Sequence, residues 1–271
     1  MSARTVLSTD EALLPEAVAA VRKAGARLRE RFDIDSRPGD LDDITAVLEA
    51  NDAAVLELLR PALEAARPGA GWVEDELAGG ALPDGEWWVT DPAEGNINHG
   101  HGMTEWSVTA TLVRDNDPVV TVVYLPLTED IYTAVRGQGA YLNGVRLHTS
   151  NKARLNAALV GTGQAKPGET AETFRQIGRT VTAMLENALV TRVSVPATMQ
   201  LIQVAAGRMD VFWQHSDVRS GLVAGALLVA EAGGTVTDLA GNPWSAASRD
   251  FLAATPALHA AAVEVLAEAL R

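Results

Sequence analysis

The sequence predicts a protein of the α+β class, a mixed α/β arrangement in which helices and sheets pack in layers. Three observations support this prediction. Two long helical patterns fill residues 11–66, closely spaced strands follow over residues 107–141, and strands alternate with helices from residue 158 onward. A strand meander followed by strand–helix alternation is typical of layered sheets and helices.

The first 70 residues carry the two helical patterns. Ser8 followed by Glu11 fits a capping box. Apolar residues then recur at helical spacing, at Leu14, Val18, Val21, Leu28 and Phe32. We expect a second helix over residues 44–66, which follows a cluster of aspartates and is ended by Pro68-Gly69. Pro61 lies inside it, so we expect this proline to kink or divide the helix.

Short strand patterns dominate the middle of the chain. Trp72-Val73 and Trp87-Trp88-Val89 are expected to be short buried strands. Strand patterns at residues 107–113, 119–125 and 131–135 are joined by short turns, which predicts an antiparallel meander. Asn143-Gly144 adds another tight turn.

The second half predicts alternating strands and helices. Strands are expected at residues 158–161, 190–195, 211–213 and near residues 235 and 251, and helices at residues 170–185, 199–206, 217–232 and 256–270. Apolar residues make up 47% of the 271-residue chain and charged residues 21%, which is ordinary for a folded protein. We therefore predict one unit over residues 1–271, with approximate lobes at 1–150 and 151–271.

Several compartments and partners fit the composition poorly. No stretch approaches the roughly 20 apolar residues that span a bilayer, and the first residues lack the pattern of a secretory signal. The absence of cysteine excludes disulfides, thiolate metal sites and thiol catalysis. We expect a cytoplasmic protein.

The formal net charge of −13 also restricts the partners. An acidic chain repels nucleic acid and anionic membranes unless it carries a local basic patch, and no run of Lys or Arg forms one. We expect neither partner. An acidic protein that handles phosphate needs bound cations at its site.

Three acidic segments are candidates for such a site: residues 74–76, residues 91–96 and Asp217. Each alone also fits an ordinary structural role, because adjacent acids are often a solvated surface, Asp-Pro-x-x-Gly is a common turn, and Asp often caps a helix. Together they suggest more. Apolar strands that end in carboxylates can converge at one sheet edge, where the like charges repel unless cations bind.

Four segments resemble motifs of the inositol monophosphatase family. Residues 87–99, WWVTDPAEGNINH, resemble the family's W-x-x-D-P-L/I-D-G-T-x-N-F/Y motif. Residues 216–221 and 227–234, SDVRSG and LLVAEAGG, resemble its W-D-x-A/S-A-G motif and the E-A-G-G that follows. Residues 72–76, WVEDE, and 137–144, GQGAYLNG, resemble its G-E-E segment and its G-x-G-A-x-x-N-G turn. Order and spacing hold over about residues 10–255, so the chain is identified as a member.

The resemblance implies layers in the order αβαβα, the sugar phosphatase fold of inositol monophosphatase and fructose-1,6-bisphosphatase. It also implies that water activated by two or three Mg²⁺ ions hydrolyses a small phosphate monoester (a sugar, cyclitol or nucleotide-derived metabolite), and that the protein is a homodimer. Hard oxygen ligands and two neighbouring ions suit such an in-line displacement.

The site residues follow from the same resemblance. The implied metal ligands are Asp75, Asp91, the carbonyl of Ala93, Glu94 and Asp217. Glu74 or Glu76 remain alternatives to Asp75, because the family's Glu-Glu pair is here stretched to three acids. The implied catalytic residues are Asp75, Asn96 and Asp52, of which Asp52 falls near an acid that assists a third metal ion through water. The implied substrate-binding residues are Gly95, Asn96, Thr198, Gln214 and Arg219.

The chain departs from the family at several of these positions. Glu94 replaces an Asp and is one methylene longer, and Asn96 replaces a Thr whose hydroxyl positions the attacking water. An amide can hydrogen-bond to water but cannot shuttle a proton. Ser216 replaces a Trp, Arg219 replaces a small residue, and Gln214 falls near an acid that binds inositol hydroxyls. Inositol phosphate is therefore a poor fit, and the substrate stays open.

Three histidines lie close in sequence to these motifs: His99, His101 and His215. They are either polar residues with ordinary hydrogen bonds, or one of them serves as an acid or base or binds a softer metal such as Zn²⁺ or Mn²⁺. Two alternatives to a phosphomonoesterase therefore remain. One is a relative whose chemistry or substrate has been redirected through the histidines and Arg219, and the other is a catalytically silent binding protein.

Overall fold

The computed structural model describes residues 9–75, 78–166 and 168–271 of the chain. Its helices are α1 (Leu14–Glu30), α2 (Leu41–Ala66), α3 (Asn96–Gly100), α4 (Ala171–Asn187), α5 (Ala197–Ala205), α6 (Arg219–Glu231) and α7 (Pro256–Ala269). Short 3₁₀ turns cover Glu11–Leu13 and Leu155–Ala157.

The strands form two sheets. The first contains β1 (Gly71–Trp72), β2 (Glu86–Glu94), β3 (Ser107–Arg114), β4 (Asp117–Leu125), β5 (Asp130–Val135), β6 (Gly139–Leu142) and β7 (Val145–Arg146), in that order. The second contains β8 (Leu159–Thr162), β9 (Val190–Val193), β10 (Val211–Gln214), β11 (Thr235–Thr237) and β12 (Phe251–Ala254), in the order β11-β12-β10-β8-β9. From β2 to β7 the first sheet is an antiparallel meander, as predicted.

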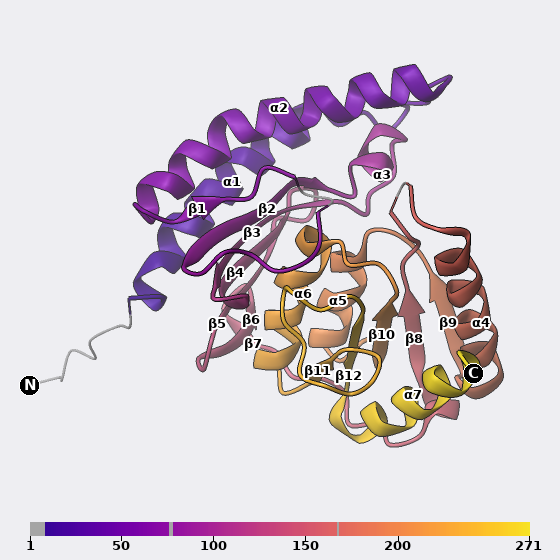
Figure 1. Cartoon of the computed structure of the whole chain (residues 1–271). Helices are drawn as coiled ribbons and strands as arrows, with labels where there is room; N and C mark the ends of the chain where they lie inside the picture. Colours follow the sequence, from indigo (N-terminus) through magenta and orange to yellow (C-terminus); the bar gives the residue numbers. More distant parts are fainter. Residues whose placement is uncertain (1–8, 76–77, 167) are drawn as a thin grey trace, which may run out of the picture.

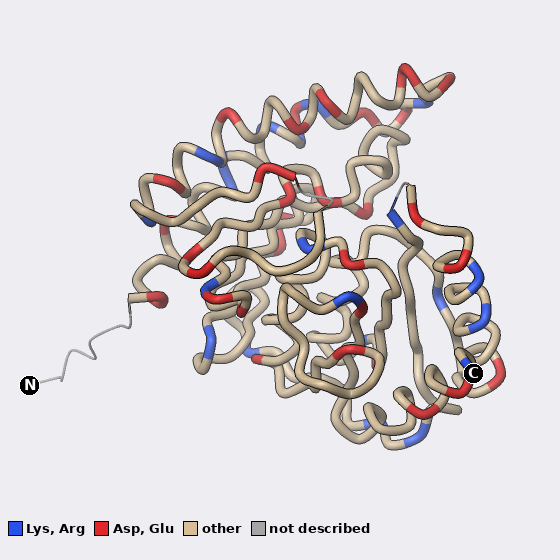
Figure 2. Tube along the Cα trace, viewed as in Figure 1, with Lys and Arg blue, Asp and Glu red and all other residues tan. Residues whose placement is uncertain are grey.

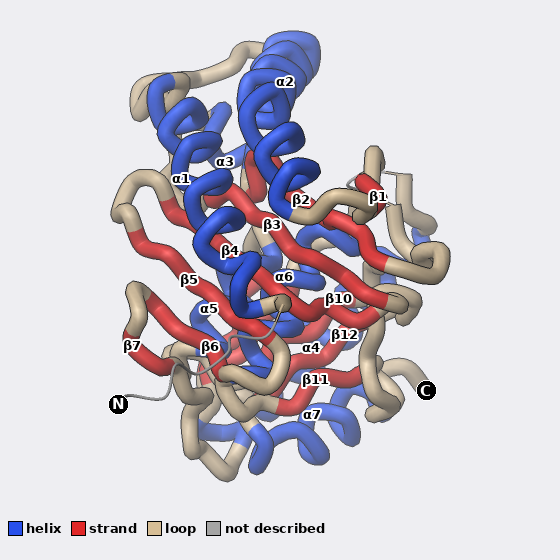
Figure 3. Tube along the Cα trace, turned by 90° about the vertical axis from the view of Figure 1, so that its left-hand side faces the viewer, coloured by secondary structure: helices blue, strands red, loops and turns tan. Residues whose placement is uncertain are grey.

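Helices and sheets alternate as five layers, so the predicted αβαβα order is confirmed. Helices α1 and α2 cover one face of the first sheet, α5 and α6 lie between the two sheets, and α4 and α7 cover the outer face of the second (Figures 1 and 3). The division into lobes near residue 150 stays a prediction.

The alternation of side chains along the strands produces these layers, because successive residues of a strand point to opposite faces of the sheet. In β4, Val122 packs into the core beneath α1 and α2, whereas Val123 packs against the central helices. In β10, Phe212 faces the central layer, whereas Val211 and Trp213 face α4 and α7.

Helix α6 is the central element of the fold. Every residue from Arg219 to Val229 is buried, as expected for a helix that is apolar on all sides. Glu231, near its C-terminal end, accepts hydrogen bonds of 2.7 Å from the backbone N–H groups of Gly137 and Gly139 through its two carboxylate oxygens. The E-A-G-G and G-x-G segments, far apart in sequence, therefore hold each other in the structure.

The helices at the start of the chain differ from expectation in one respect. Asp40 caps α2 by accepting a hydrogen bond from the N–H of Asp43, at 2.9 Å. Pro61 does not divide this helix, which runs unbroken to Ala66. Both Pro61 and Glu57, whose carbonyl loses its usual partner, are exposed, so water can satisfy that carbonyl. Ser8 of the expected capping box lies outside the described residues.

The distribution of charged residues and the lengths of the helices bear on the expected partners. Figure 2 shows Lys and Arg interspersed among more numerous Asp and Glu along the chain. None of the helices in the described ranges is long and apolar enough to cross a membrane.

Candidate functional site

The first candidate segment is the end of β2. Its pairing with β3 shifts by one residue between Asp91 and Glu94, so the strand bulges where Pro92 cannot donate a ladder hydrogen bond. Asp91 is half-buried, and its Oδ1 accepts a hydrogen bond from the N–H of Ala93 at 3.2 Å. The bulge therefore turns the acidic end of the strand out of the regular ladder.

Gly95 makes the sharp turn that follows. Its φ of +87° is unfavourable for other residues, and an added Cβ would lie 2.7 Å from the carbonyl oxygen of Glu105 and 3.0 Å from Pro196. The turn leads into α3, a helix that the sequence analysis did not predict. Gly95 thus lets the motif approach the segment before α5, where the Val195–Pro196 peptide bond is cis.

Asn96 is fixed by helix α2. Its Nδ2 donates to Asp52 Oδ1 at 2.8 Å and to the carbonyl of Leu48 at 3.1 Å, and its Oδ1 accepts from Asn51 at 2.8 Å. Both amide hydrogens are used, so only an acceptor lone pair of this side chain remains for other contacts. Burial raises the pKa of Asp52 to about 6, although the hydrogen bond from Asn96 favours its charged form.

Glu94 reaches the central helices. Its side chain is 3% exposed, and its Oε1 accepts a hydrogen bond of 3.3 Å from the backbone N–H of Thr198 at the start of α5. The hydroxyl of Thr198 donates to the carbonyl of Gly221 in α6. Gly221 itself lies beside the Glu94 carboxylate. Residues of both large sequence motifs therefore meet at Glu94, whose carboxylate lies at the positive N-terminal end of α5.

Asp217 has a partner that the sequence analysis missed. Lys166 Nζ lies 3.0 Å from Asp217 Oδ1, and each of these side chains is less than a third exposed. Lys166 belongs to the loop after β8, which precedes α4. The sequence signal for Lys166 as a site residue was its position in a loop that follows a strand. A single Lys in a loop forms no motif, so this signal was too weak to use.

Arg219 does not extend into solvent. The residue is 5% exposed, and its Nη2 donates to the carbonyls of Gly79 and Gly80, both at 2.7 Å. Gln214 is also buried and donates from Nε2 to the carbonyl of Ser216 at 3.2 Å. The structure thus places both expected substrate-binding residues against neighbouring backbone.

The side chains of the three histidines form hydrogen bonds with neighbouring protein groups. His99 is buried, where Nε2 lies 3.1 Å from the carbonyl of Leu28 and Nδ1 lies 3.0 Å from Asn51 Nδ2. An acceptor at one nitrogen and a donor at the other fix the neutral form with its proton on Nε2, and burial lowers its pKa. His101, which follows α3, has its Nδ1 2.7 Å from the carbonyl of Ile97 in that helix.

His215 contacts α4. Its Nε2 lies 3.0 Å from Thr180 Oγ1, which also accepts from Trp213, and burial lowers the pKa of His215 to about 4. All three histidines therefore make ordinary hydrogen bonds, which is the first of the two alternatives given in the sequence analysis.

The acidic residues 74 and 75 are exposed. Glu74 forms an ion pair with Arg60 at 2.8 Å, whereas Glu76 lies outside the described residues. In the described ranges, no three His, Asp or Glu side chains lie together in a way that would hold one metal ion. The donor chemistry nevertheless fits Mg²⁺, because Asp75, Asp91, Glu94 and Asp217 all offer hard carboxylate oxygens. The pairing of Asp217 with Lys166 is the contact that a cation at Asp217 must replace.

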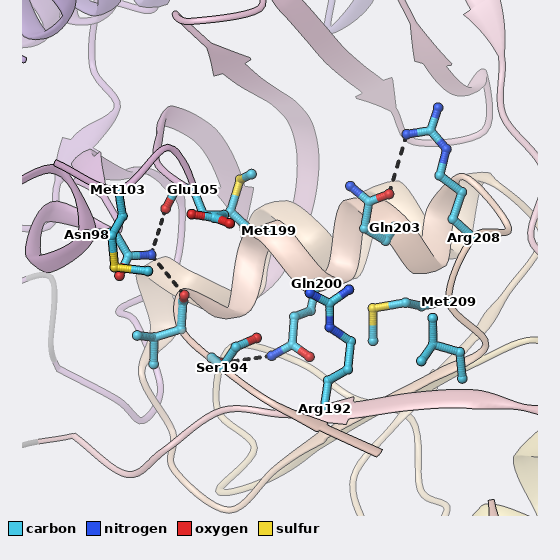
Figure 4. A pocket seen from close by; sticks show the side chains of 12 residues that line it. Asn98, Met103, Glu105, Arg192, Ser194, Met199, Gln200, Gln203, Arg208 and Met209 are labelled. Atoms are coloured by element: carbon cyan, nitrogen blue, oxygen red, sulfur yellow. Dashed lines mark hydrogen bonds between the residues drawn. The ribbon is translucent and has the colours of Figure 1, made fainter. Parts of the chain in front are cut away.

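A separate cavity of about 320 Å³ lies between α5, the end of β9 and the segment after α3 (Figure 4). Its walls include Arg192, Arg208 and three of the chain's five methionines, Met103, Met199 and Met209. Asn98 bridges two of its edges by donating to the carbonyls of Glu105 and Val195. The described lining contains none of the implied metal ligands.

Comparison with known proteins places this layered fold in one family. The sequence model of the inositol monophosphatase family matches residues 9–271, so the chain belongs to that family. It is 34% identical to the inositol-1-monophosphatase of Rhizobium meliloti (strain 1021) over 238 residues, which covers 85% of this chain and 87% of the relative.

Another relative carries a different name. The Nus factor SuhB of Haemophilus influenzae is 32% identical over 239 residues, covering 86% of this chain and 87% of that protein. Among solved structures, the extragenic suppressor protein suhB from Bartonella henselae superposes with a TM-score of 0.79 at 26% identity, over 94% of this chain and 98% of that one. Family membership and fold, as predicted from the motifs, are thus confirmed.

Proposed function

We propose that the chain is a Mg²⁺-dependent phosphomonoesterase that hydrolyses a small phosphorylated metabolite, a sugar, cyclitol or nucleotide derivative. The observation that carries this proposal is the contact of Glu94 with Thr198 and its place beside Gly221. It brings the acidic end of β2 to the start of α6, which begins two residues after Asp217, and so supports a shared site for the two motifs.

Different residues of the chain have different roles in this proposal. Asp75, Asp91, Glu94, Asp217 and the carbonyl of Ala93 would hold Mg²⁺, which when bound activates water and neutralises charge on the phosphate. The backbone around Gly95 and Asn96 would contact the phosphate, whereas Gln214, which is buried and bonded to the carbonyl of Ser216, makes no contact with substrate in this proposal. Asp52 and the free lone pair of Asn96 orient water. Thr198 holds Glu94 in place through its N–H.

The test is release of inorganic phosphate from a panel of phosphate esters, with Mg²⁺ and with chelator. Asp91→Asn and Asp217→Asn each keep the side-chain shape but remove a charged ligand, so we expect each to abolish activity without loss of fold. Asp117→Asn is the matched control, because the Asp117 side chain is 49% exposed and, in the described structure, its ion pair is with Arg136. Most activity retained in both site variants refutes the metal assignment.

One observation favours a second candidate, a binding protein with little catalysis. Both amide hydrogens of Asn96 are held by α2, so this residue has no proton to donate to the attacking water. A Mg²⁺ titration separates the two. Stabilisation by Mg²⁺ and by phosphate esters without any phosphate release establishes the binding protein.

A homodimer and a cytoplasmic location belong to the same proposal. Strand β9 is at the edge of its sheet, and Leu185, Leu189, Val190 and Val193 on or beside it are 47–66% exposed. An apolar edge strand is a ready surface for a second copy of the chain. Sedimentation should show a dimer that Val190→Lys with Val193→Lys dissociates, and a monomeric parent chain contradicts this.

A further inference from the structure

Arg219 is bound to a segment far away in sequence. Besides the two bonds from Nη2 to the carbonyls of Gly79 and Gly80, its own N–H donates to the carbonyl of Ala78 at 3.3 Å. One residue at the start of α6 thus holds three consecutive carbonyls of the segment 78–80. Hydrogen bonds from a charged donor are stronger than neutral ones.

This segment lies directly on Asp217. A Cβ built at Gly79 would fall 2.1 Å from Asp217 Oδ2 and 2.5 Å from its carbonyl oxygen, so only glycine fits there. The N–H of Ala78 donates to the carbonyl of Asp75 at 3.2 Å, which ties Asp75 to the held segment. Two candidate ligands from distant motifs, Asp75 and Asp217, are therefore connected through the contacts of Arg219.

The charge of Arg219 suits this place. Burial lowers its pKa, while the charges of Asp217 and Asp75 oppose that shift. Two carboxylates brought together repel each other, and a guanidinium beside both offsets the repulsion. The small residue of the motif that residues 216–221 resemble would supply neither the charge nor the hydrogen bonds.

We propose that Arg219 is a positioning residue, which docks the segment 78–80 on the start of α6 and so holds Asp75 near Asp217 before any cation binds. This rests on the proposed function only in that Asp75 and Asp217 are taken as the ligands. It also accounts for Arg219 without a contact to substrate.

The sign of one measurement separates this role from simple charge repulsion. If Arg219 acted only as a neighbouring positive charge, its removal would strengthen Mg²⁺ binding. If Arg219 positions the segment 78–80, Arg219→Ala must weaken Mg²⁺ binding by about tenfold. In that variant the segment is no longer held in advance, so part of the binding free energy of Mg²⁺ is spent on ordering it.

The experiment compares Arg219→Ala, Arg219→Lys and Arg37→Ala with the parent chain. Arg37 is the matched control, because its Nη1 also binds three backbone carbonyls, those of Ile34, Ser36 and His101, in another loop. The readouts are amide hydrogen exchange of residues 78–82 and Mg²⁺ affinity by calorimetry.

We expect exchange of residues 78–82 to accelerate at least tenfold in Arg219→Ala and less in Arg219→Lys, which keeps the charge, with no change there in Arg37→Ala. Unchanged exchange in Arg219→Ala, or tighter Mg²⁺ binding, overturns the proposal. If the parent chain binds no Mg²⁺, the exchange result still decides on positioning, and the missing affinity counts against the proposed function instead.

Discussion

The side-chain amide of Asn96 donates a 2.8 Å hydrogen bond to the carboxylate of Asp52, and this joins the phosphatase motif to helix α2. The carboxylate is partly buried, its pKa is about 6, and the neighbouring Asn51 and Leu48 fix the amide from the same helix. Helix α2 therefore fixes the side chain at the position where the motif that residues 87–99 resemble has Thr.

The first prediction concerns the stability cost of ionised Asp52. Its folded-state pKa of about 6 lies above the ordinary value of 3.8, so the folded protein binds the proton more tightly and loses stability as pH rises between these values. In chelator, we expect Asp52→Asn to stabilise the protein at pH 8 by about 1–2 kcal/mol, with a smaller difference at pH 4. Urea unfolding measures this. Glu57→Gln, at an exposed position of the same helix, should show no such trend, and an equal effect at both pH values contradicts the prediction.

The second prediction concerns Lys166. Its ammonium lies 3.0 Å from Asp217, so Mg²⁺ would have to displace it if Asp217 is a ligand, as proposed. We expect Lys166→Met to tighten Mg²⁺ binding about fivefold, which corresponds to about 1 kcal/mol for a partly exposed ion pair. Calorimetry is the measurement. Arg175→Met on α4, whose partner is Glu172, removes the same charge away from Asp217 and should leave the affinity nearly unchanged. Equal tightening in both variants would show a general charge effect only.

The third prediction concerns His215. Its pKa of about 4 lies below the ordinary 6.5, so the unfolded chain binds the proton first, and stability falls as pH drops from 6.5 towards 4. His215→Gln, which retains a donor for Thr180, should reduce the stability lost between pH 7 and pH 4.5 by about 2 kcal/mol. Urea titrations at the two pH values give the comparison. An unchanged pH dependence would mean that folding does not lower the pKa of His215, and it contradicts the prediction.

The fourth prediction concerns the two departures in the motif. Glu94→Asp withdraws the carboxylate from the N–H of Thr198, and Asn96→Thr restores a hydroxyl that can both donate and accept. We expect the double variant to release phosphate from simple esters faster than the parent chain, which we expect to be a weak phosphatase. Lower activity in the double variant indicates that Glu94 and Asn96 are adapted to another substrate. Robust hydrolysis of inositol monophosphate by the parent chain contradicts this expectation directly.

Much of the architecture was predictable because the pattern was local. The apolar periodicity of residues 107–135 predicted the meander, and Asn143-Gly144 predicted the turn between β6 and β7, where both residues have positive φ. Helix α3 was missed because five residues carry too little periodicity. Its start depends on the turn at Gly95, which is determined by contacts with Glu105 and Pro196.

The site was harder to predict because its contacts are long-range. The motifs indicated Asp91, Glu94 and Asp217, but no spacing rule could show that Lys166 pairs with Asp217 or that Arg219 binds the carbonyls of residues 79 and 80. Three histidines lie close in sequence to the motifs, and the sequence left open whether they have a functional role or make ordinary hydrogen bonds. The side chains of His99 and His215 point into packed regions, because neighbours in sequence on a helix or loop need not face the same way.

The burial of α6 has a consequence for how this site can change over evolutionary time. The helix is enclosed from Arg219 to Val229 and tied through Glu231 to the turn at Gly137 and Gly139, and a Cβ at Gly225 would lie 2.3 Å from Leu201, so beyond its first turn it cannot shift or gain bulk there without disturbing both sheets. New substrates must therefore be accommodated by the loops that meet its first turn, those carrying Lys166 and residues 78–80. Divergent members of such a lineage should vary most in those loops, while the helix keeps its small and apolar residues.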